Sequence, residues 1–410
     1  MSLPPLVPSR GRRFAITARI LSSVVFTFVC YVCIGIPLAV LPGFAHLDLG
    51  YSTIIAGLAV SAQYLATLLS RPHGGRMADA MGPKRTVISG LVVLTCAGLF
   101  LALAALVPTM PALSMALILL SRFGLGFAES WIGTGAITWG IGAVSGEHTA
   151  RVISWNGIAT YGGIALGAPL GVTLAHDYGL VSLGILTVVL GLVTLPFAFW
   201  KARIAPSAGE RLPFRSVLSR VTPYGIGLAL GSIGFGSLST FVALYYASRG
   251  WEGAALSLSV FGGCFIGIRL IFGNAINRFG GYRVAIVSLV AECLGLLVLW
   301  LGTTPDMAMA GAALTGSGFA LIFPALGVEA VSRVSTHNRG AALGAFSVFL
   351  DVALGLTGPA GGWVAGGFGY PQIFLLAGVA SLAGAILSFG LYLRFGRDTE
   401  DRGQRAGARA

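Results

Sequence analysis

Long apolar runs follow one another along almost the whole 410-residue chain. Each holds about 20 residues or more, and an α-helix of that length crosses the ~30 Å hydrocarbon core of a bilayer. Only 10% of the residues are charged, whereas a soluble protein of this size has about 25%. The sequence therefore predicts an all-α protein that crosses a membrane many times.

The apolar runs predict about twelve spans, near 16–41, 52–70, 86–107, 112–142, 151–175, 180–200, 222–247, 254–275, 284–303, 307–331, 340–366 and 371–393. The only sizeable polar linker falls between the sixth and seventh spans. We therefore predict an N-terminal six-helix bundle and a C-terminal one, joined by a cytoplasmic linker and followed by a disordered cytoplasmic tail. The N-terminal bundle is predicted to span 1–200, the linker 201–220, the C-terminal bundle 221–395 and the tail 396–410.

The basic residues predict the orientation of the chain. They gather at the N-terminus, in the linker, in the tail and in every second short loop, whereas the alternate loops hold one base, Arg249. Lys and Arg are enriched in cytoplasmic loops, so both termini and the linker are placed in the cytoplasm, in a bacterial inner membrane. The net charge of +12 then indicates topology and contact with lipid. Because the bases are dispersed over short segments, nucleic acid is not an expected partner.

The two halves of the sequence repeat one another. RPHGGRMADAMGPKR, from Arg71, matches RLIFGNAINRFGGYR, from Arg269, and GAPLG at 167–171 matches GPAGG at 358–362. A repeat with an even number of spans keeps its orientation in the membrane, so the halves are related by an axis along the membrane normal. Two parallel halves with a cleft at mid-membrane form a transporter that works by alternating access.

Several motifs resemble those of a known family. The pattern GxxxDxxGxKR after the second span, Arg122 and Gly126 in the fourth, and a Gly/Pro-rich fifth span resemble the major facilitator superfamily. Stretches such as LLSRPHGGRMADAMGPKR and GWEGAALSL are similar, more narrowly, to bacterial YhhS-type efflux permeases. The resemblance implies a monomeric secondary transporter that exports a small organic solute by antiport with protons. It needs no cofactor beyond the proton gradient.

Two alternatives remain open. Solute–proton symport, which would take solute into the cell, fits the same architecture. A membrane-embedded enzyme is a remote alternative, since the five histidines lie scattered in loops and neither HExxH nor GxSxG occurs. Cys30 and Cys33 have CxxC spacing, but in an apolar helix without a nearby histidine they indicate packing, so no metal site is expected.

Ionisable groups within the spans are the candidates for proton coupling, because each is costly in the bilayer unless paired or hydrated. Asp351 lies near the centre of the eleventh span with no base near it in sequence, and it is the first candidate for the proton carrier. A simple hydrogen bond to a neighbouring helix is the alternative. Glu129 and Arg122 share a face of the fourth span, where they either pass a proton or neutralise each other.

Two further acids, Glu292 and Glu329, are each predicted to pair with an arginine. Arg269 and Glu292 lie at equal depth on either side of the Gly280–Gly281 turn, and we predict a buried ion pair between them, which either fixes the helical hairpin or takes part in coupling. Glu329 is expected to pair locally with Arg333, one helical turn away.

The loop after the second span is predicted to be a cytoplasmic gate. Its residues are Gly75, Arg76, Asp79, Gly82, Lys84 and Arg85. The resemblance implies that Asp79 caps the eleventh helix of the opposite half, where the helix dipole favours a carboxylate; an inert tight turn is the alternative. A nucleotide loop would follow a β-strand, so that function is disfavoured.

Polar and aromatic residues on four spans are candidates for contact with the solute. They are Tyr31, Gln63, Trp155, Asn156, Tyr245 and Tyr246. The alternative is that the aromatic residues pack or lie in the interfacial belt. A low density of charge in these spans favours a neutral, amphipathic or cationic solute over a polyanion.

Overall fold

The computed structural model describes residues 10–144, 149–204, 214–273, 275–334 and 339–407, and over these residues it is all-helical. Within these described ranges, twelve helices are long and apolar enough to cross a membrane. The N-terminal half contains α1 (Arg10–Leu38), α3 (Thr53–Met81), α4 (Pro83–Leu106), α5 (Pro111–Ala143), α6 (Thr149–Tyr178) and α7 (Val181–Trp200). The C-terminal half contains α8 (Phe214–Ser248), α9 (Ala254–Ile271), α11 (Gly281–Leu301), α12 (Pro305–Phe319) with α13 (Ile322–Val331), α14 (Arg339–Phe368) and α15 (Pro371–Gly407). Short turns α2 (Leu41–Gly43), η1 (Phe44–Asp48) and α10 (Ala275–Phe279) complete the described elements.

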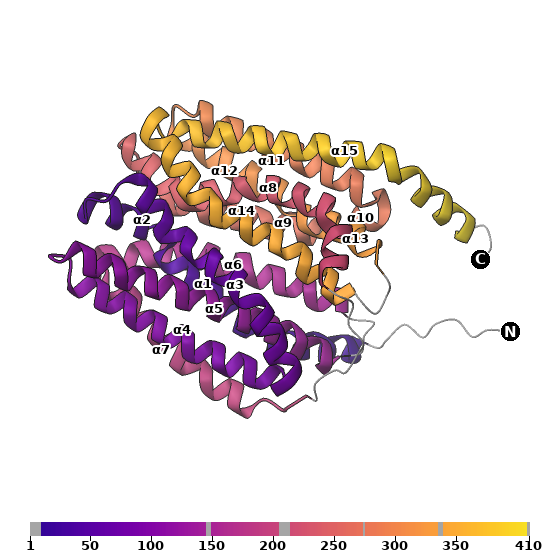
Figure 1. The fold of residues 1–410 in the computed structure, drawn as a ribbon, viewed down its shortest axis with the longest axis horizontal. Helices are drawn as coiled ribbons and strands as arrows, with labels where there is room; N and C mark the ends of the chain where they lie inside the picture. The colour runs from indigo at the N-terminus through magenta and orange to yellow at the C-terminus, as the bar shows by residue number, and fades with distance from the viewer. Residues whose placement is uncertain (1–9, 145–148, 205–213, 274, 335–338, 408–410) are drawn as a thin grey trace.

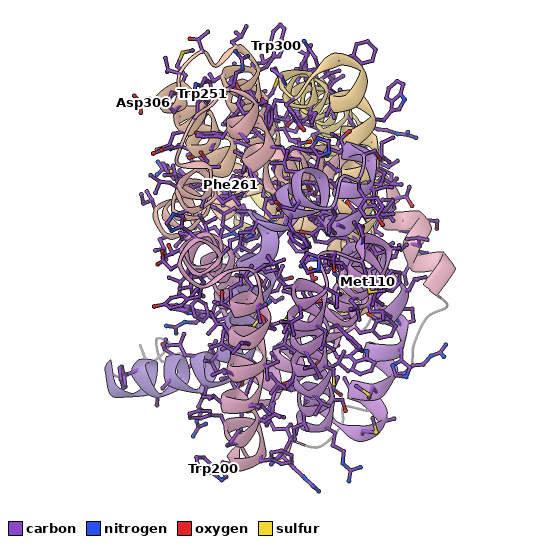
Figure 2. The ribbon with its side chains drawn as sticks, turned by 90° about the vertical axis from the view of Figure 1, so that its left-hand side faces the viewer. Met110, Trp200, Trp251, Phe261, Trp300 and Asp306 are labelled. Carbon is purple, nitrogen blue, oxygen red and sulfur yellow. The ribbon has the colours of Figure 1, made fainter. Side chains whose placement is uncertain are left out.

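The two halves lie side by side as parallel bundles (Figure 1). We call the end of the molecule where α7 finishes and α8 begins the linker end, and the other the opposite end. In a view from the opposite end, Trp251, Trp300 and Asp306 lie over the C-terminal half and Met110 over the N-terminal half (Figure 2). The predicted fold class, twelve spanning helices in two parallel halves, is confirmed.

The predicted boundaries of linker and tail differ from the structure. Helix α8 begins at Phe214, inside the predicted linker, and α15 continues to Gly407, through the tail that we predicted to be disordered. The tail carries acids and bases four residues apart, such as Asp398 with Arg402 and Asp401 with Arg405. Acids and bases four residues apart attract each other along one side of a helix, so they stabilise a helix even where it has no apolar face to pack.

The backbone repeats between halves at the turns that follow α3 and α10. Gly82 and Gly280 both have positive φ, +86° and +82°, and each is the residue immediately before a spanning helix. Only glycine adopts this conformation without strain. The sequence repeat therefore corresponds to a repeat in structure.

The tenth span is broken where the sequence has a proline. Helix α12 ends at Phe319 and α13 begins at Ile322. The residue four positions after Ala320 is Pro324, which has no N–H to donate to the Ala320 carbonyl. That carbonyl oxygen is left for a partner from another helix.

Contacts between the halves concentrate toward the opposite end. There α3 packs against α14 so closely that a Cβ added at Gly57 would lie 2.3 Å from the Gly358 carbonyl oxygen. Thr53 donates to the Gly362 carbonyl at 2.8 Å, and Ser61 donates to that of Leu354 at 3.1 Å. The largest apolar core cluster also crosses between the halves, joining Leu38, Val60, Tyr64, Ile164 and Ala168 to α8 and α9. These contacts hold the two halves together toward the opposite end.

Candidate functional site

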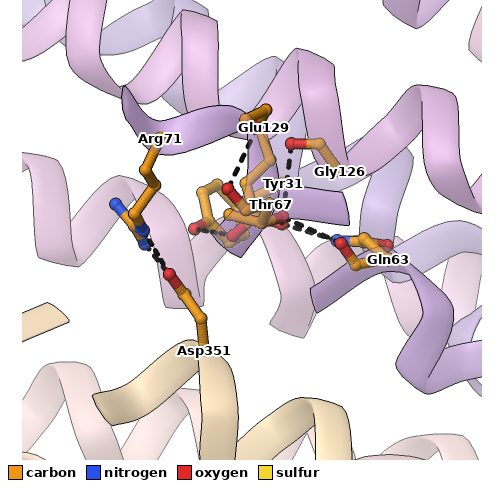
Figure 3. A network of polar contacts seen from close by, with 8 residues as sticks. Tyr31, Gln63, Thr67, Arg71, Gly126, Glu129 and Asp351 are labelled. Carbon is orange, nitrogen blue, oxygen red and sulfur yellow. Dashed lines mark hydrogen bonds and ion pairs between the residues drawn. The ribbon is translucent and has the colours of Figure 1, made fainter. Parts of the chain in front are cut away.

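An ion pair joins the two halves in the interior of the molecule. Arg71 on α3 donates through Nε and Nη2 to the two carboxylate oxygens of Asp351 on α14, with 2.9 Å between Nη2 and Oδ1 (Figure 3). The Asp351 side chain is 1% exposed and that of Arg71 is 28% exposed. A two-pronged contact between guanidinium and carboxylate is the strongest kind of charged hydrogen bonding in proteins.

This pair corrects two expectations. Arg71 was predicted to lie in a loop after the second span, but α3 runs on to Met81, so Arg71 lies within a spanning helix. Asp351 was predicted to be a lone carboxyl without a nearby base. The base that pairs with Asp351 is Arg71, which belongs to the other half of the chain. The residues around Asp351 in the sequence therefore could not predict this partner.

Glu129 on α5 anchors a polar cluster, which we define as Tyr31, Gln63, Thr67 and Glu129. Tyr31 donates to Oε1 at 2.9 Å, and Gln63 Nε2 and Thr67 Oγ1 lie 2.7 and 3.1 Å from Oε2. The four side chains come from α1, α3 and α5, and the cluster lies beside the Arg71–Asp351 pair (Figure 3). The charges of Asp351 and Arg71 both act on Glu129.

Arg122 does not bond to Glu129, although both lie on α5. Its side chain is 0% exposed, and its three guanidinium nitrogens have no hydrogen-bond partner in the described part of the chain. Of the two alternatives given for Arg122 and Glu129, direct neutralisation is not observed, because Glu129 bonds to the polar cluster; transfer of a proton stays a prediction.

The predicted Arg269–Glu292 ion pair is wrong. Arg269 Nε donates to the Ala320 carbonyl at 2.9 Å, while Glu292 accepts from Ser381 at 2.9 Å inside the C-terminal half. Equal depth did not make the two residues neighbours, because α9 packs on α6 and α12 whereas α11 packs on α12 and α15. Glu329 also differs: its carboxylate lies against Gly281 at the start of α11, and Arg333 donates instead to Tyr224.

Some of the residues predicted to contact solute form polar side-chain hydrogen bonds, and the others pack in the protein interior. Tyr31 and Gln63 belong to the polar cluster, and Asn156 accepts a 2.7 Å hydrogen bond from Thr27. Trp155 packs in a small apolar cluster of α1 and α6. Tyr245 and Tyr246 are buried toward the opposite end and bond to backbone carbonyls of the α11–α12 connection, so they are packing residues.

The gating motif is described only in part. The Asp79 side chain lies outside the described residues, so its contact with α14 remains a prediction. Lys84 Nζ bonds to the carbonyls of Phe199 and Lys201 at the end of α7, at 2.5 and 2.7 Å. Arg76 and Arg85 are exposed, and a Cβ on Gly75 would meet open space. The described part of the motif is thus anchored to its own half.

Replacing Glu129 by Gln should destabilise the protein by about 1–3 kcal/mol, because an amide nitrogen would face the donors of Gln63 or Tyr31 and leave buried groups unpaired. Tyr31→Phe, which removes a single bond, should cost about 1 kcal/mol. Thermal unfolding in detergent measures both. Equal stability of Glu129→Gln and the unmodified protein would contradict a carboxylate that accepts all three hydrogen bonds of the polar cluster.

Comparisons with known proteins agree with this architecture. The family model of the Major Facilitator Superfamily matches residues 24–274 and 254–409. An uncharacterised MFS-type transporter of Burkholderia mallei (strain SAVP1) is 57% identical over 391 residues, covering 95% of this chain and 96% of the relative. One from Pseudomonas aeruginosa (strain UCBPP-PA14) is 55% identical over 395 residues, covering 96% of this chain and 98% of its own.

Solved structures show the same fold at low sequence identity. The human organic anion transporter MFSD10 superposes with a TM-score of 0.69 at 16% identity, over 94% of this chain and 100% of its own. The nucleoside transporter NupG gives 0.72 at 16% identity, over 91% and 100%. The narrower resemblance to YhhS-type permeases stays a prediction. The chain belongs to the major facilitator superfamily and is a multi-pass membrane transporter rather than an enzyme.

Proposed function

We propose that this transporter exports a small organic solute from the bacterial cytoplasm in exchange for protons, and that Asp351 carries the proton. The observation that supports this is the buried Arg71–Asp351 pair, whose partners belong to different halves. In a medium of low dielectric constant, Asp351 is stable either as a carboxylate paired with Arg71 or as a neutral acid. A proton and Arg71 therefore compete for the same carboxylate.

This competition links protonation to the relative position of the halves. Binding of a proton to Asp351 breaks the ion pair with Arg71, which links α3 to α14. The proton therefore favours arrangements in which these two helices are farther apart. A ligand shifts a conformational equilibrium by its difference in affinity for the two states. The proton has such a difference here, because only one state offers it a carboxylate that is not already paired.

The basic residues at the linker end support a cytoplasmic location for that end. The described contacts would then close the periplasmic side, and the protein would be in an inward-facing state. The export direction rests on the resemblance to efflux permeases, and solute–proton symport is the alternative with the same pair as its proton site.

Everted membrane vesicles distinguish the two directions. The solute is first identified by a thermal-shift screen on the purified protein, and is then added to energised vesicles whose lumen is acidic. We expect the lumen to become more alkaline, because protons leave as solute enters. If the lumen becomes more acidic, solute and protons move together and symport is the mechanism. Transport of solute with no proton movement would refute both.

A further inference from the structure

Arg269 is the counterpart of Arg71 in the second half of the chain. The two arginines occupy the same position of the sequence repeat, one on α3 and the other on α9. Arg71 reaches α14 of the C-terminal half. Arg269 reaches α6 of the N-terminal half, where a Cβ added at Gly157 would lie 2.0 Å from its Nη1 atom. Each guanidinium thus lies against a helix of the other half.

The two sites differ in what the facing helix offers. The residue of α6 that lies against Arg269 is Gly157, which has no side chain, and Thr160 follows one helical turn further along the same helix. Arg269 therefore has no carboxylate opposite it, and its only hydrogen bond in the described structure is the one from Nε to Ala320. Of the two arginines related by the repeat, Arg71 has a carboxylate partner in the described structure and Arg269 does not.

The Arg269 guanidinium is held through Nε and through the face of its plane, and its outer nitrogens make no hydrogen bond in the described structure. Pro324 breaks the tenth span and leaves the Ala320 carbonyl to accept from Nε at 2.9 Å. The ring of Phe265 lies 4.6 Å below the guanidinium, and this stacking fixes the plane of the group. Nη1 lies against Gly157 of α6, and Nη1 and Nη2 make no hydrogen bond within the described structure. A group held in this way loses little freedom when it binds a ligand.

A guanidinium without a counter-charge is unfavourable in a membrane span, and Arg269 lies in one. We propose that Arg269 binds the carboxylate of the transported solute, which takes the place that Asp351 occupies at the other site. The Tyr161 ring lies against Phe265, tilted by 34° with 3.8 Å between ring centroids, and is partly exposed, so an aromatic or other apolar body would have a surface to lie on. The inferred substrate class is an organic monoanion, and this inference rests on the proposed transport function.

A direct binding measurement tests the site without any proton gradient. The full-length protein in a neutral detergent is titrated with acetate, benzoate and 1-naphthoate, and with the matching neutral amides, and heat release or thermal stabilisation is recorded. We expect at least one carboxylate to bind and its amide not to bind. Arg269→Gln should weaken that binding by roughly tenfold or more. Arg278→Gln, which removes an exposed base from α10, is the matched control and should leave it unchanged.

A second variant supplies the missing charge from within the protein. Thr160→Asp should pair with Arg269 and abolish the response to carboxylates in a protein that remains folded. Equal carboxylate binding by the unmodified protein and Arg269→Gln, or binding of phosphate-headgroup lipid alone, would overturn the inference. If Arg269 binds carboxylates but vesicles show no proton movement, the anion site stands and the proposed coupling fails.

Discussion

Asp351→Asn should abolish proton-coupled transport. The amide cannot take up a proton at physiological pH, and it leaves the Arg71 guanidinium without its counter-charge. Loss of one partner of a fully buried pair costs about 3–5 kcal/mol, but Arg71 is 28% exposed, so we expect about 1–3 kcal/mol. Proton flux in proteoliposomes and thermal unfolding in detergent measure the two effects.

The double variant separates coupling from stability. Arg71→Gln with Asp351→Asn replaces the ion pair by two amides, and its stability should exceed the sum expected from the single variants, because neither charge is left alone. Its proton coupling should stay lost, since neither amide can take up the proton that Asp351 is proposed to carry. Proton-driven transport by Asp351→Asn at a normal rate would show that another group, with Glu129 the nearest candidate, carries the proton.

Gly57→Ala should shift the protein away from the state described here. Its new Cβ would lie 2.3 Å from the Gly358 carbonyl oxygen, a distance that requires α3 and α14 to move apart at the opposite end. Val60, which is 0% exposed in the cluster that joins the halves, reports this opening when it is replaced by cysteine. We expect labelling of that cysteine by a water-soluble maleimide to increase at least several-fold.

Gly355→Ala is the matched control on the same contact. A Cβ at this position of α14 would meet its nearest atom, the Leu65 nitrogen, at 3.7 Å, which is ordinary van der Waals contact. Labelling of the Val60→Cys reporter should therefore be unchanged. If Gly57→Ala and Gly355→Ala give the same labelling, close approach of the two backbones does not control the opening.

The sequence predicted the architecture well because the bilayer imposes simple rules. Apolar length determines a span, and a repeat with an even number of spans determines a parallel arrangement. It predicted Asp351 and Glu129 as buried acids but assigned Asp351 no base, since Arg71 was counted as a loop residue. The useful signal was present: Arg71 and Arg269 align in the repeat, and Arg269 had been recognised as lying inside a span.

The Arg269–Glu292 error has a different origin. Depth along a helix can be computed from residue number, but the direction of a side chain around the helix depends on which helices are neighbours. The break at Pro324 was also readable in the sequence, and so was its consequence that the Ala320 carbonyl would lack a helical partner. Which side chain satisfies that carbonyl could be known only from the packing of α9 against α12.

The tight contact at Gly57 and the ion pair at Arg71 lie on one rigid helix, about 21 Å apart along its axis. If α3 rotates relative to α14 about the contact at Gly57, a rotation of a few degrees moves Arg71 by about an ångström or more. The length of the Arg71 side chain then limits how far the two halves can separate at the linker end before the bond to Asp351 breaks. Lysine in its place would keep the charge but shorten the side chain.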